Sequence, residues 1–451
     1  MRHCLVALIW LGTLFGARPT SAQTGLPYAT RTLSFSGIST SVEGDIRTVG
    51  MAGAAAGLAD TFIAAIDSPA GLAMTVRQGD IHFSGDSVTD GHVQDPSQEI
   101  HTSSFGLALS LYPWAVSAGY RSPYREEALY RLQSTPQDPA VLSVTTREIV
   151  LSAARVFANN RLSLGVTVLL GQAQRSLTLA SGPDTGISYA SYSAGATLGA
   201  MVRLPLRLLV SASVSSPIHY SAGGNDVQQN TSLPGFFQAV DVPWRAVLGV
   251  GFIPNRFARA DFTLRILGGT DHAALLRDET ALVGESITVQ PHIGAAYVFA
   301  DYKELKGTVF GGTYFESTRI RGTDGRLHGS AGIEGRVWIV TLGAGVDIAD
   351  QYRNYLVSIG VDVFNLMARL QMIPTAQVPP YGRILPRPDF LSEEGLARPL
   401  VEHWDSAQPE VDPVKAGLEL PDKIKPGIEN ARKAIEDFID PKQEPPSPPP
   451  Q

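Results

Sequence analysis

The chain has 451 residues, of which 44% are hydrophobic and 18% are charged. This apolar content is too high for an intrinsically disordered protein. Glycine and proline together make up about one residue in six, which argues against a helix-rich fold and indicates many turns. Because barrels often exceed the usual domain length as one unit, the first expectation is a single large all-β unit.

The first residues have the order of a secretory signal peptide. Met1, Arg2 and His3 are followed by the apolar run 5–15, and the small residues Thr20-Ser21-Ala22 come next. We therefore expect a signal peptide over residues 1–22. The alternative is a buried N-terminal helix. No later stretch approaches the ~18 continuous apolar residues of a transmembrane helix.

The composition after this signal limits cofactors and partners. The single cysteine, Cys4, lies inside the signal, so the mature chain carries no thiol, and disulfides and Cys-based metal sites are excluded. Without Arg2 and Arg18, 34 basic and 43 acidic residues remain, with no basic cluster. Nucleic acid is therefore not an expected partner, and we expect no metal and no cofactor.

Residues 79–364 alternate apolar residues with small or polar ones. In one such run Leu162, Leu164 and Val166 alternate with Ser163 and Gly165. This period of two predicts strands with two different faces. A soluble sandwich would expose a face rich in Lys, Glu and Thr, whereas the second face here is mainly Gly, Ala and Ser.

Short and long connections alternate strictly between these strands. Tight turns are expected near 112–114, 158–161, 204–206, 254–256, 301–304 and 338. Longer polar connections are expected near 86–102, 122–143, 179–188, 219–242, 268–285, 316–326 and 349–353. Six turns and seven loops join fourteen strands, and this asymmetry is typical of outer-membrane barrels. Residues 79–364 therefore predict a transmembrane antiparallel β-barrel of about 14 strands in outer-membrane lipid, with aromatic residues such as Trp114 and Trp338 in its interfacial girdle.

Residues 365–451 differ in kind, because they contain 16 of the 31 prolines. Such a segment cannot build a sheet. We expect a periplasmic Pro-rich tail with a short helix near 426–439, which is marginal on its own. The tail is a candidate for recruiting a periplasmic protein, and the alternative is a fluctuating spacer.

The segment 23–78 before the barrel predicts a plug for the lumen. Its small residues, among them Gly50, Gly53 and Gly57, allow close approach to a wall of Gly, Ala and Ser. An ordinary soluble Ala-rich helix is the alternative. Three motifs follow in order: Val49-Gly50-Met51-Ala52-Gly53-Ala54, Leu58-Ala59-Asp60 and Ser68-Pro69-Ala70-Gly71-Leu72. This order resembles the N-terminal signature of the long-chain fatty-acid transporter (FadL) family.

The resemblance implies passive uptake of hydrophobic molecules that are captured at extracellular loops and pass a plug that acts as a gate. The plug and gate residues that it implies are Gly50, Gly53, Gly57, Asp60, Asp67, Ser68, Pro69, Ala70 and Gly71. Two features depart from the family pattern. Ser68 replaces the usual Asn, and the connection 179–188 is short where the family has a helical loop.

One long connection is unusually apolar. It contains Leu233, Phe236 and Phe237, and Trp244 follows. Exposed aromatic patches usually mark interaction sites, so we predict that these residues form a substrate-capture loop. Packing across the barrel mouth or dipping into the outer leaflet are the alternatives.

The late strands carry charged residues on their second face. Charges that face lipid near the midplane cost ~2 to 4 kcal/mol each for Arg or Lys, so these side chains should point into the lumen. Pairing with the plug residues Arg47, Asp60 and Asp67 would fix the plug; the alternative is a solvated polar lumen. The predicted lumen residues are Arg245, Arg259, Asp261, Arg265, His292, Glu334 and Arg336.

Motifs of hydrolases, zinc proteases and P-loop enzymes do not occur, and the nine histidines are scattered. Ser330 with His292 or His328 is the one pairing that spacing leaves open. We expect no enzyme and no catalytic residues. The sequence predicts an outer-membrane transporter for fatty-acid-like or aromatic molecules. The alternative is a non-transporting anchor or secretion-associated barrel whose tail recruits periplasmic partners.

Overall fold

The computed structural model describes most of residues 42–363, and all structural statements concern the described residues. These residues are 42, 44–54, 61–74, 79–90, 100–111, 113–131, 139–157, 161–179, 187–205, 207–221, 240–255, 257–268, 287–301, 305–317, 325–363, 366–367 and 370. The predicted signal peptide (1–22) and the predicted helix 426–439 lie outside them.

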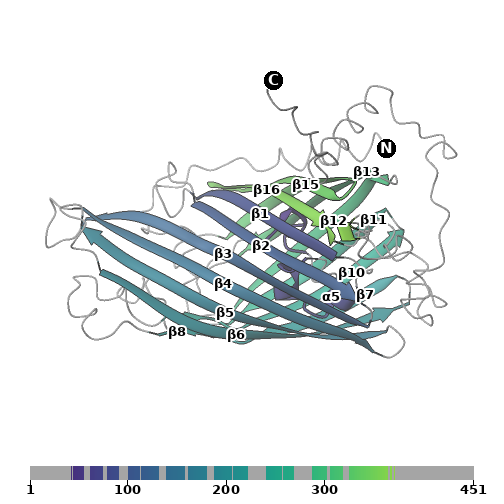
Figure 1. The fold of residues 1–451 in the computed structure, drawn as a ribbon, viewed down its shortest axis with the longest axis horizontal. Coiled ribbons are helices and arrows are strands. Elements are labelled where there is room, and N and C mark those ends of the chain that lie inside the picture. The colour runs from purple at the N-terminus through teal and green to yellow at the C-terminus, as the bar shows by residue number, and fades with distance from the viewer. Residues whose placement is uncertain are drawn as a thin grey trace, which may run out of the picture.

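Fourteen antiparallel strands form a closed barrel (Figure 1), and this confirms the predicted strand count. Each strand pairs with its neighbours in the chain order of the barrel, and β1 pairs with β16 to close it. The barrel strands are β1 (Gly79–Asp90), β2 (Ile100–Leu111), β3 (Trp114–Arg131), β4 (Pro139–Phe157), β5 (Leu162–Leu179), β6 (Ile187–Leu204), β7 (Leu208–Ser215), β10 (Arg245–Asn255), β11 (Ala258–Leu267), β12 (Thr288–Asp301), β13 (Leu305–Glu316), β14 (Arg326–Val337), β15 (Val340–Ala349) and β16 (Tyr352–Asp362). A separate two-stranded sheet is formed by β8 (Ile218–Tyr220) and β9 (Val240–Val242).

The strand boundaries confirm the six tight turns. Short and long connections alternate as far as β15, but the last expected long connection, 349–353, is a two-residue turn at 350–351 between β15 and β16. One expected connection, 122–143, is much shorter than predicted, because β3 and β4 stay paired as far as Arg131 and Pro139. The polar residues of this segment suggested a loop. Paired strands that extend beyond the lipid can also carry polar residues on their outer face, because water surrounds them there. The expected connection 219–242 contains the small sheet of β8 and β9.

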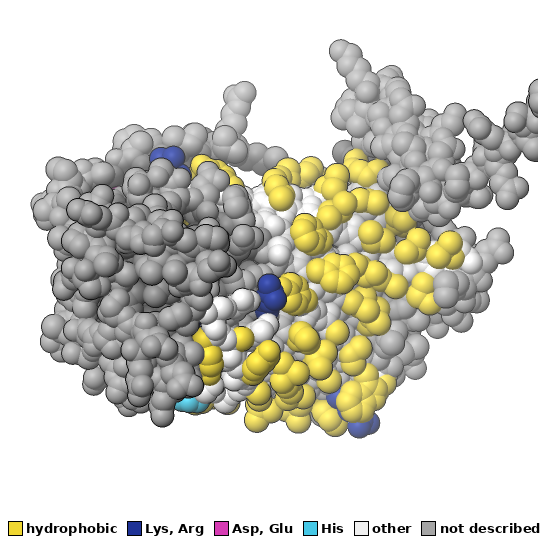
Figure 2. All heavy atoms as spheres, turned by 60° about the vertical axis from the view of Figure 1, so that its left-hand side comes forward, with side chains coloured by type: hydrophobic (Ala, Val, Ile, Leu, Met, Phe, Trp, Pro, Cys, Tyr) yellow, Lys and Arg dark blue, Asp and Glu magenta, His cyan; other side chains and the backbone are white. Residues whose placement is uncertain are grey.

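The two faces of the barrel wall differ as the alternation predicts. On β16, Tyr355, Val357 and Ile359 are exposed, whereas Asn354 and Ser358 are buried. Figure 2 shows hydrophobic side chains spread over the described part of one outer face, with few Lys or Arg side chains among them. An apolar outer face and a small, polar inner face are the surfaces that a barrel presents to lipid and to its own lumen.

The two predicted girdle tryptophans differ. Trp114 is half exposed on the outer face, as predicted. Trp338 is buried, and its prediction as an outer-face residue was wrong. It lies in the two-residue turn between β14 and β15 with a φ of 61°, and such turns require positive φ. The indole is therefore not available to the lipid.

Four neighbouring strands are longer than a membrane crossing needs. β3 to β6 have 18 or 19 residues, whereas about 10 are enough for a tilted strand. On the outer face of β5, the apolar run that ends at Val168 and Leu170 gives way to Gln172 and Gln174. This change marks where the wall leaves the lipid, and in Figure 1 these strands extend beyond the rest of the barrel.

Three short helices lie against the inner side of the wall, α3 (Ile46–Gly50), α4 (Ala64–Asp67) and α5 (Gly71–Met74). We call the described residues between 42 and 74 the plug. The plug lies in the lumen, where α3 contacts β13 to β16 and α5 contacts β2 to β5. The Asp45 side chain caps α3 by accepting a hydrogen bond of 2.8 Å from the Thr48 backbone N–H. None of the described helices is long and apolar enough to cross a bilayer.

The plug approaches the wall at pairs of glycines that face each other across neighbouring strands. A Cβ on Gly165, for example, would stand 2.5 Å from the Ala70 backbone nitrogen, which is too close for any other residue. A Cβ on Gly106 or Gly119 would likewise lie too close to the Phe62 ring, at 2.5 and 2.3 Å. The four pairs are Gly106–Gly119 under Phe62, Gly165–Gly199 under Pro69 and Ala70, Gly294–Gly312 under Met51, and Gly332–Gly345 under Ile46.

We predict that Gly294→Ala loosens the plug, because its Cβ would overlap the Met51 carbonyl oxygen. Overpacking of this kind costs about 1–3 kcal/mol. Gly311→Ala is the control on the adjacent strand, since a Cβ there meets nothing within 4 Å. A cysteine placed at the buried Ala54 should react faster with a membrane-impermeant maleimide in the Gly294 variant. Equal rates in both variants would refute the close fit.

Candidate functional site

Two ionic contacts join the plug to the wall, and the first is buried. Arg47 of α3 donates to Glu334 of β14 through Nε and Nη2, each 2.9 Å from a carboxylate oxygen. The two side chains are only 7% and 5% exposed. This bidentate geometry is the strong form of an arginine–carboxylate pair.

The second contact joins Asp67 of α4 to two arginines of the wall. The Asp67 oxygens lie 2.7 Å from Arg245 Nη2 and 2.6 Å from Arg265 Nη2. The side chains of Asp67 and Arg245 are 21% and 24% exposed, so this contact is more accessible than the first. Burial by itself raises the pKa of Asp67, but the guanidinium groups of Arg245 and Arg265 outweigh it and hold that pKa at about 2.

Hydroxyl groups of the wall hold the plug backbone between these ionic contacts. Ser163 donates to the Ala70 carbonyl oxygen at 2.8 Å, and Thr167 donates to that of Ala65 at 2.9 Å. Ser213 donates to the Asp67 carbonyl oxygen. We did not predict these contacts from the sequence, although Ser and Thr at inward positions of the alternating strands are the signal that marks them.

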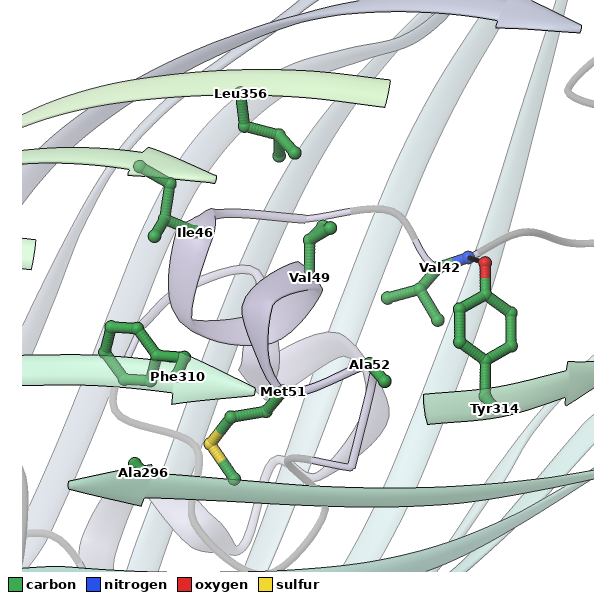
Figure 3. Close-up of a cluster of buried hydrophobic side chains, with 9 residues drawn as sticks. All are labelled: Val42, Ile46, Val49, Met51, Ala52, Ala296, Phe310, Tyr314 and Leu356. Carbon is green, nitrogen blue, oxygen red and sulfur yellow. Dashed lines mark hydrogen bonds between the residues drawn. The ribbon is translucent and has the colours of Figure 1, made fainter. Parts of the chain in front are cut away.

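The N-terminal half of the plug packs on an aromatic part of the wall (Figure 3). Tyr314 accepts a hydrogen bond of 3.2 Å from the Val42 backbone N–H and donates one of 2.9 Å to Asp347. His292 Nδ1 lies 2.6 Å from the Ala52 carbonyl oxygen, so this nitrogen is the donor. Tyr314 was not among the predicted site residues. Around these contacts, Val42, Ile46, Val49, Met51 and Ala52 of the plug form a buried cluster with Ala296, Phe310, Tyr314 and Leu356 of the wall.

A buried polar network lies beside Tyr314. His328 places Nε2 at 3.0 Å from Glu316 and Nδ1 at 3.2 Å from Asp347. Ser330 donates to Asp347 at 3.1 Å, so its hydroxyl is bonded to a carboxylate and not to a histidine base. The described residues contain no group of three or more His, Cys, Asp or Glu that would hold a metal ion.

Other predicted lumen charges pair within the wall. Arg259 pairs with Asp261 on the same strand, and Arg336 pairs with Asp362 at 3.0 Å. These contacts do not involve the plug. All the predicted lumen residues lie on the inner face; Arg245 is partly exposed and the others are buried.

The remaining predicted residues fall into two groups. Gly50, Gly53, Ser68, Pro69 and Gly71 lie in the described plug. Trp244 is 36% exposed where β10 begins, beside Gly268. Gly57 and Asp60 of the plug, and Leu233, Phe236 and Phe237 of the predicted capture loop, lie outside the described residues.

We predict that Glu334→Gln destabilises the plug strongly, because it leaves the buried Arg47 without its carboxylate. Breaking a buried ion pair costs about 3–5 kcal/mol, whereas replacing both partners by apolar residues is far milder. The double variant Arg47→Met/Glu334→Leu should therefore recover most of the loss. Denaturant-dependent labelling of a cysteine at Ala54 measures the plug's free energy of unfolding. A double variant as unstable as the single one would contradict this reading.

We predict that the Asp67 contact persists to low pH. The pKa of this group falls from an ordinary 3.8 to about 2 in the folded protein. Its stabilisation is therefore complete above pH 4 and disappears as the pH falls through about 2. The distance between spin labels on α4 and β10 should lengthen in this range. Asp67→Asn, which lacks the titrating group, is the control and should show no such step.

No protein-family model and no curated protein matches the sequence. Among solved structures, the P. putida toluene transporter TodX is similar with a TM-score of 0.51 and 12% identity, covering 72% of this chain and 99% of that chain. A Pseudomonas aeruginosa FadL homologue is similar with a TM-score of 0.50, 12% identity and the same coverage. The chain therefore has the fold of these two proteins, a closed fourteen-stranded β-barrel.

Proposed function

We propose that the protein is a transporter of the bacterial outer membrane that mediates passive uptake of hydrophobic small molecules, with the plug as its gate. The observation that carries this proposal is a plug held by side-chain contacts inside a barrel whose outer face is apolar. In this proposal a solute passes the lumen only when the plug moves. An anchor that transports nothing needs no such contacts.

The comparisons support the same function. The two similar structures are a toluene transporter and a FadL homologue, and the match with this chain extends over 99% of each of them. The Ser330 hydroxyl donates its hydrogen bond to Asp347, so the one serine–histidine pairing that the sequence leaves open is not formed.

The alternation of connections gives the orientation that we propose. Tight turns face the periplasm in such barrels, and long connections face the outside. The tail from residue 365 then starts in the periplasm. Leu233, Phe236, Phe237 and Trp244 belong to the outer side, where they capture an apolar ligand before it enters the lumen.

Uptake of radiolabelled toluene by Gram-negative cells that express the protein tests this function. We expect uptake several-fold faster than in cells with an empty vector. A disulfide between Pro69→Cys and Gly199→Cys should abolish the gain until it is reduced, because Pro69 Cγ lies 3.0 Å from the position of a Cβ on Gly199. The Pro69→Cys variant alone, measured with and without reductant, is the control. Uptake that ignores the disulfide would show that the plug is not the gate.

Two further variants test whether the predicted capture loop binds the ligand and whether the protein is an anchor instead of a transporter. Phe236→Ser/Phe237→Ser should slow toluene uptake while the folded barrel persists in the membrane; unchanged uptake would remove this loop from the mechanism. Deletion of residues 365–451 should leave uptake intact. The anchor function holds instead if cells that express the unaltered protein take up no toluene, and if the deletion releases a periplasmic protein that otherwise co-purifies.

A further inference from the structure

The outer face of the barrel changes in character along one row of residues that crosses β4, β5 and β6. Arg147 pairs in register with Gln172, and Gln172 pairs with Tyr192. All three residues lie on the outer face, where Tyr192 is 71% exposed. Gln172 Nε2 donates a hydrogen bond of 3.2 Å to the Tyr192 hydroxyl. We call these three residues the boundary row, because Ile149 and Leu170 in the adjacent row are apolar and exposed.

The height of the boundary row in the membrane follows from the geometry of β4. Phe157 is exposed on the same outer face, ten positions from Arg147 and beside a tight turn. At ~3.3 Å per residue and a tilt of ~45°, this stretch of strand rises roughly 23 Å. The apolar band of such barrels is ~25 Å tall, so the boundary row lies where the headgroups of the outer leaflet begin. Figure 2 shows the apolar side chains of the described outer face giving way to polar ones, with a Lys or Arg side chain at the border.

The side chains beyond the boundary row are neutral groups that form hydrogen bonds. Gln174 and Ser188 are exposed on the outer face, and Gln174 Nε2 lies 3.5 Å from the Ser188 hydroxyl. Thr145 is the residue paired with Gln174 on β4. Among the described outer-face residues of this area Arg147 is the one charge, since the neighbouring Glu148 is buried and paired with an arginine of the lumen.

These groups together match the chemistry of a phosphorylated sugar. A guanidinium binds a phosphate through paired N–H donors. Amide and hydroxyl groups both donate and accept hydrogen bonds, as sugar hydroxyls require of their partners. An exposed tyrosine adds an apolar ring with a polar tip. At the level of the outer-leaflet headgroups of a bacterial outer membrane, the molecule that carries phosphates on sugars above its acyl chains is lipopolysaccharide.

We propose that the outer face of β4 to β6 is a binding surface for lipopolysaccharide. Arg147 binds a phosphate of the lipid A part, and the amide and hydroxyl groups around it bind the sugars. The acyl chains lie on the apolar outer face that begins at Ile149 and Leu170. A glycerophospholipid would satisfy the arginine but would leave the amides and hydroxyls to water. The proposal does not depend on transport, because it requires only that the barrel lies in the outer membrane.

A second arginine on the same face of β4 offers a matched control. Arg155 is exposed eight positions from Arg147, toward the tight turn. Its guanidinium lies 4.9 Å from the centre of the Trp114 ring and 5.1 Å from that of Phe157. Its partner in register is Leu164, so its neighbours are apolar where those of Arg147 are polar. A phosphorylated sugar therefore finds hydrogen-bonding partners beside Arg147 and not beside Arg155.

Binding of deep-rough lipopolysaccharide to the purified full chain, measured by native mass spectrometry in detergent, tests the proposal. Arg147→Gln should weaken binding by about tenfold or more, the factor for one lost hydrogen bond to a charged group. Arg155→Gln, the same substitution among apolar neighbours, should bind like wild type. The double variant Gln172→Ala/Tyr192→Ala should weaken binding of lipopolysaccharide and leave binding of phosphatidylglycerol unchanged. Heat-dependent gel mobility shows whether each variant is a folded barrel.

Two altered ligands separate a glycolipid site from general attraction of charge. Lipopolysaccharide from which the phosphates have been removed should bind equally to wild type and to Arg147→Gln, because the arginine then has no phosphate to bind. Phosphatidylglycerol should bind more weakly than lipopolysaccharide. Equal binding of the two lipids, with the same dependence on Arg147, would mean that the surface recognises any lipid phosphate, and the proposal would be wrong. An equal loss in Arg147→Gln and Arg155→Gln, or no loss in either, would also overturn it.

Discussion

The near contact between the plug backbone and the wall glycines is the constraint on which the rest of the lumen depends. At Gly165, Gly294 and Gly312 a single added carbon would collide with backbone atoms of the plug, and at Gly106 and Gly119 it would collide with the Phe62 ring. Close packing of this kind fixes position more sharply than polar contacts do, because repulsion rises steeply with overlap. Arg47 and Asp67 meet their partners because the glycine pairs have already fixed the height and rotation of the plug.

Charge in the lumen follows a simple rule. Buried charges cost free energy unless they are paired, and the wall charges described here pair either with one another or with the plug. The pairs inside the wall, such as Arg259 with Asp261, remain intact when the plug moves. The pairs that reach the plug do not, so they set the electrostatic cost of plug movement. Of these, the Asp67 contact is the more exposed, and it is the one that a solute can reach.

The sequence was sufficient to predict the features that depend on the alternation of inward and outward side chains along each strand. The inward direction of Arg245, Arg259 and Arg265 follows from it, because a charge one position away would face lipid. The sequence could not tell which of these arginines meets the plug, since all three are equivalent along their strands. That choice depends on the rotation of α4 in the lumen.

Three further features of the structure were not predicted from the sequence, each for its own reason. Trp338 resembles a girdle residue by its position beside a turn, but its side chain is buried and its backbone has a positive φ. The length of β3 and β4 was underestimated because the apolar pattern ends at the lipid boundary while hydrogen bonding between the strands continues. The hydroxyls of Ser163 and Thr167 are ordinary inward residues by sequence, and only the plug backbone beside them gives them a role.

The order of the chain has a consequence for assembly. The plug precedes β1, yet α3 contacts β13 to β16, and the pair Arg47–Glu334 joins residues 287 positions apart. Contacts between such distant residues form late, because the loop that joins them must first be closed. The seam between β1 and β16 is also completed only when the last strand is present. The helix α3 can therefore reach its final position only when the last strands are present, so that docking of the plug and closure of the seam belong to the same late stage of assembly.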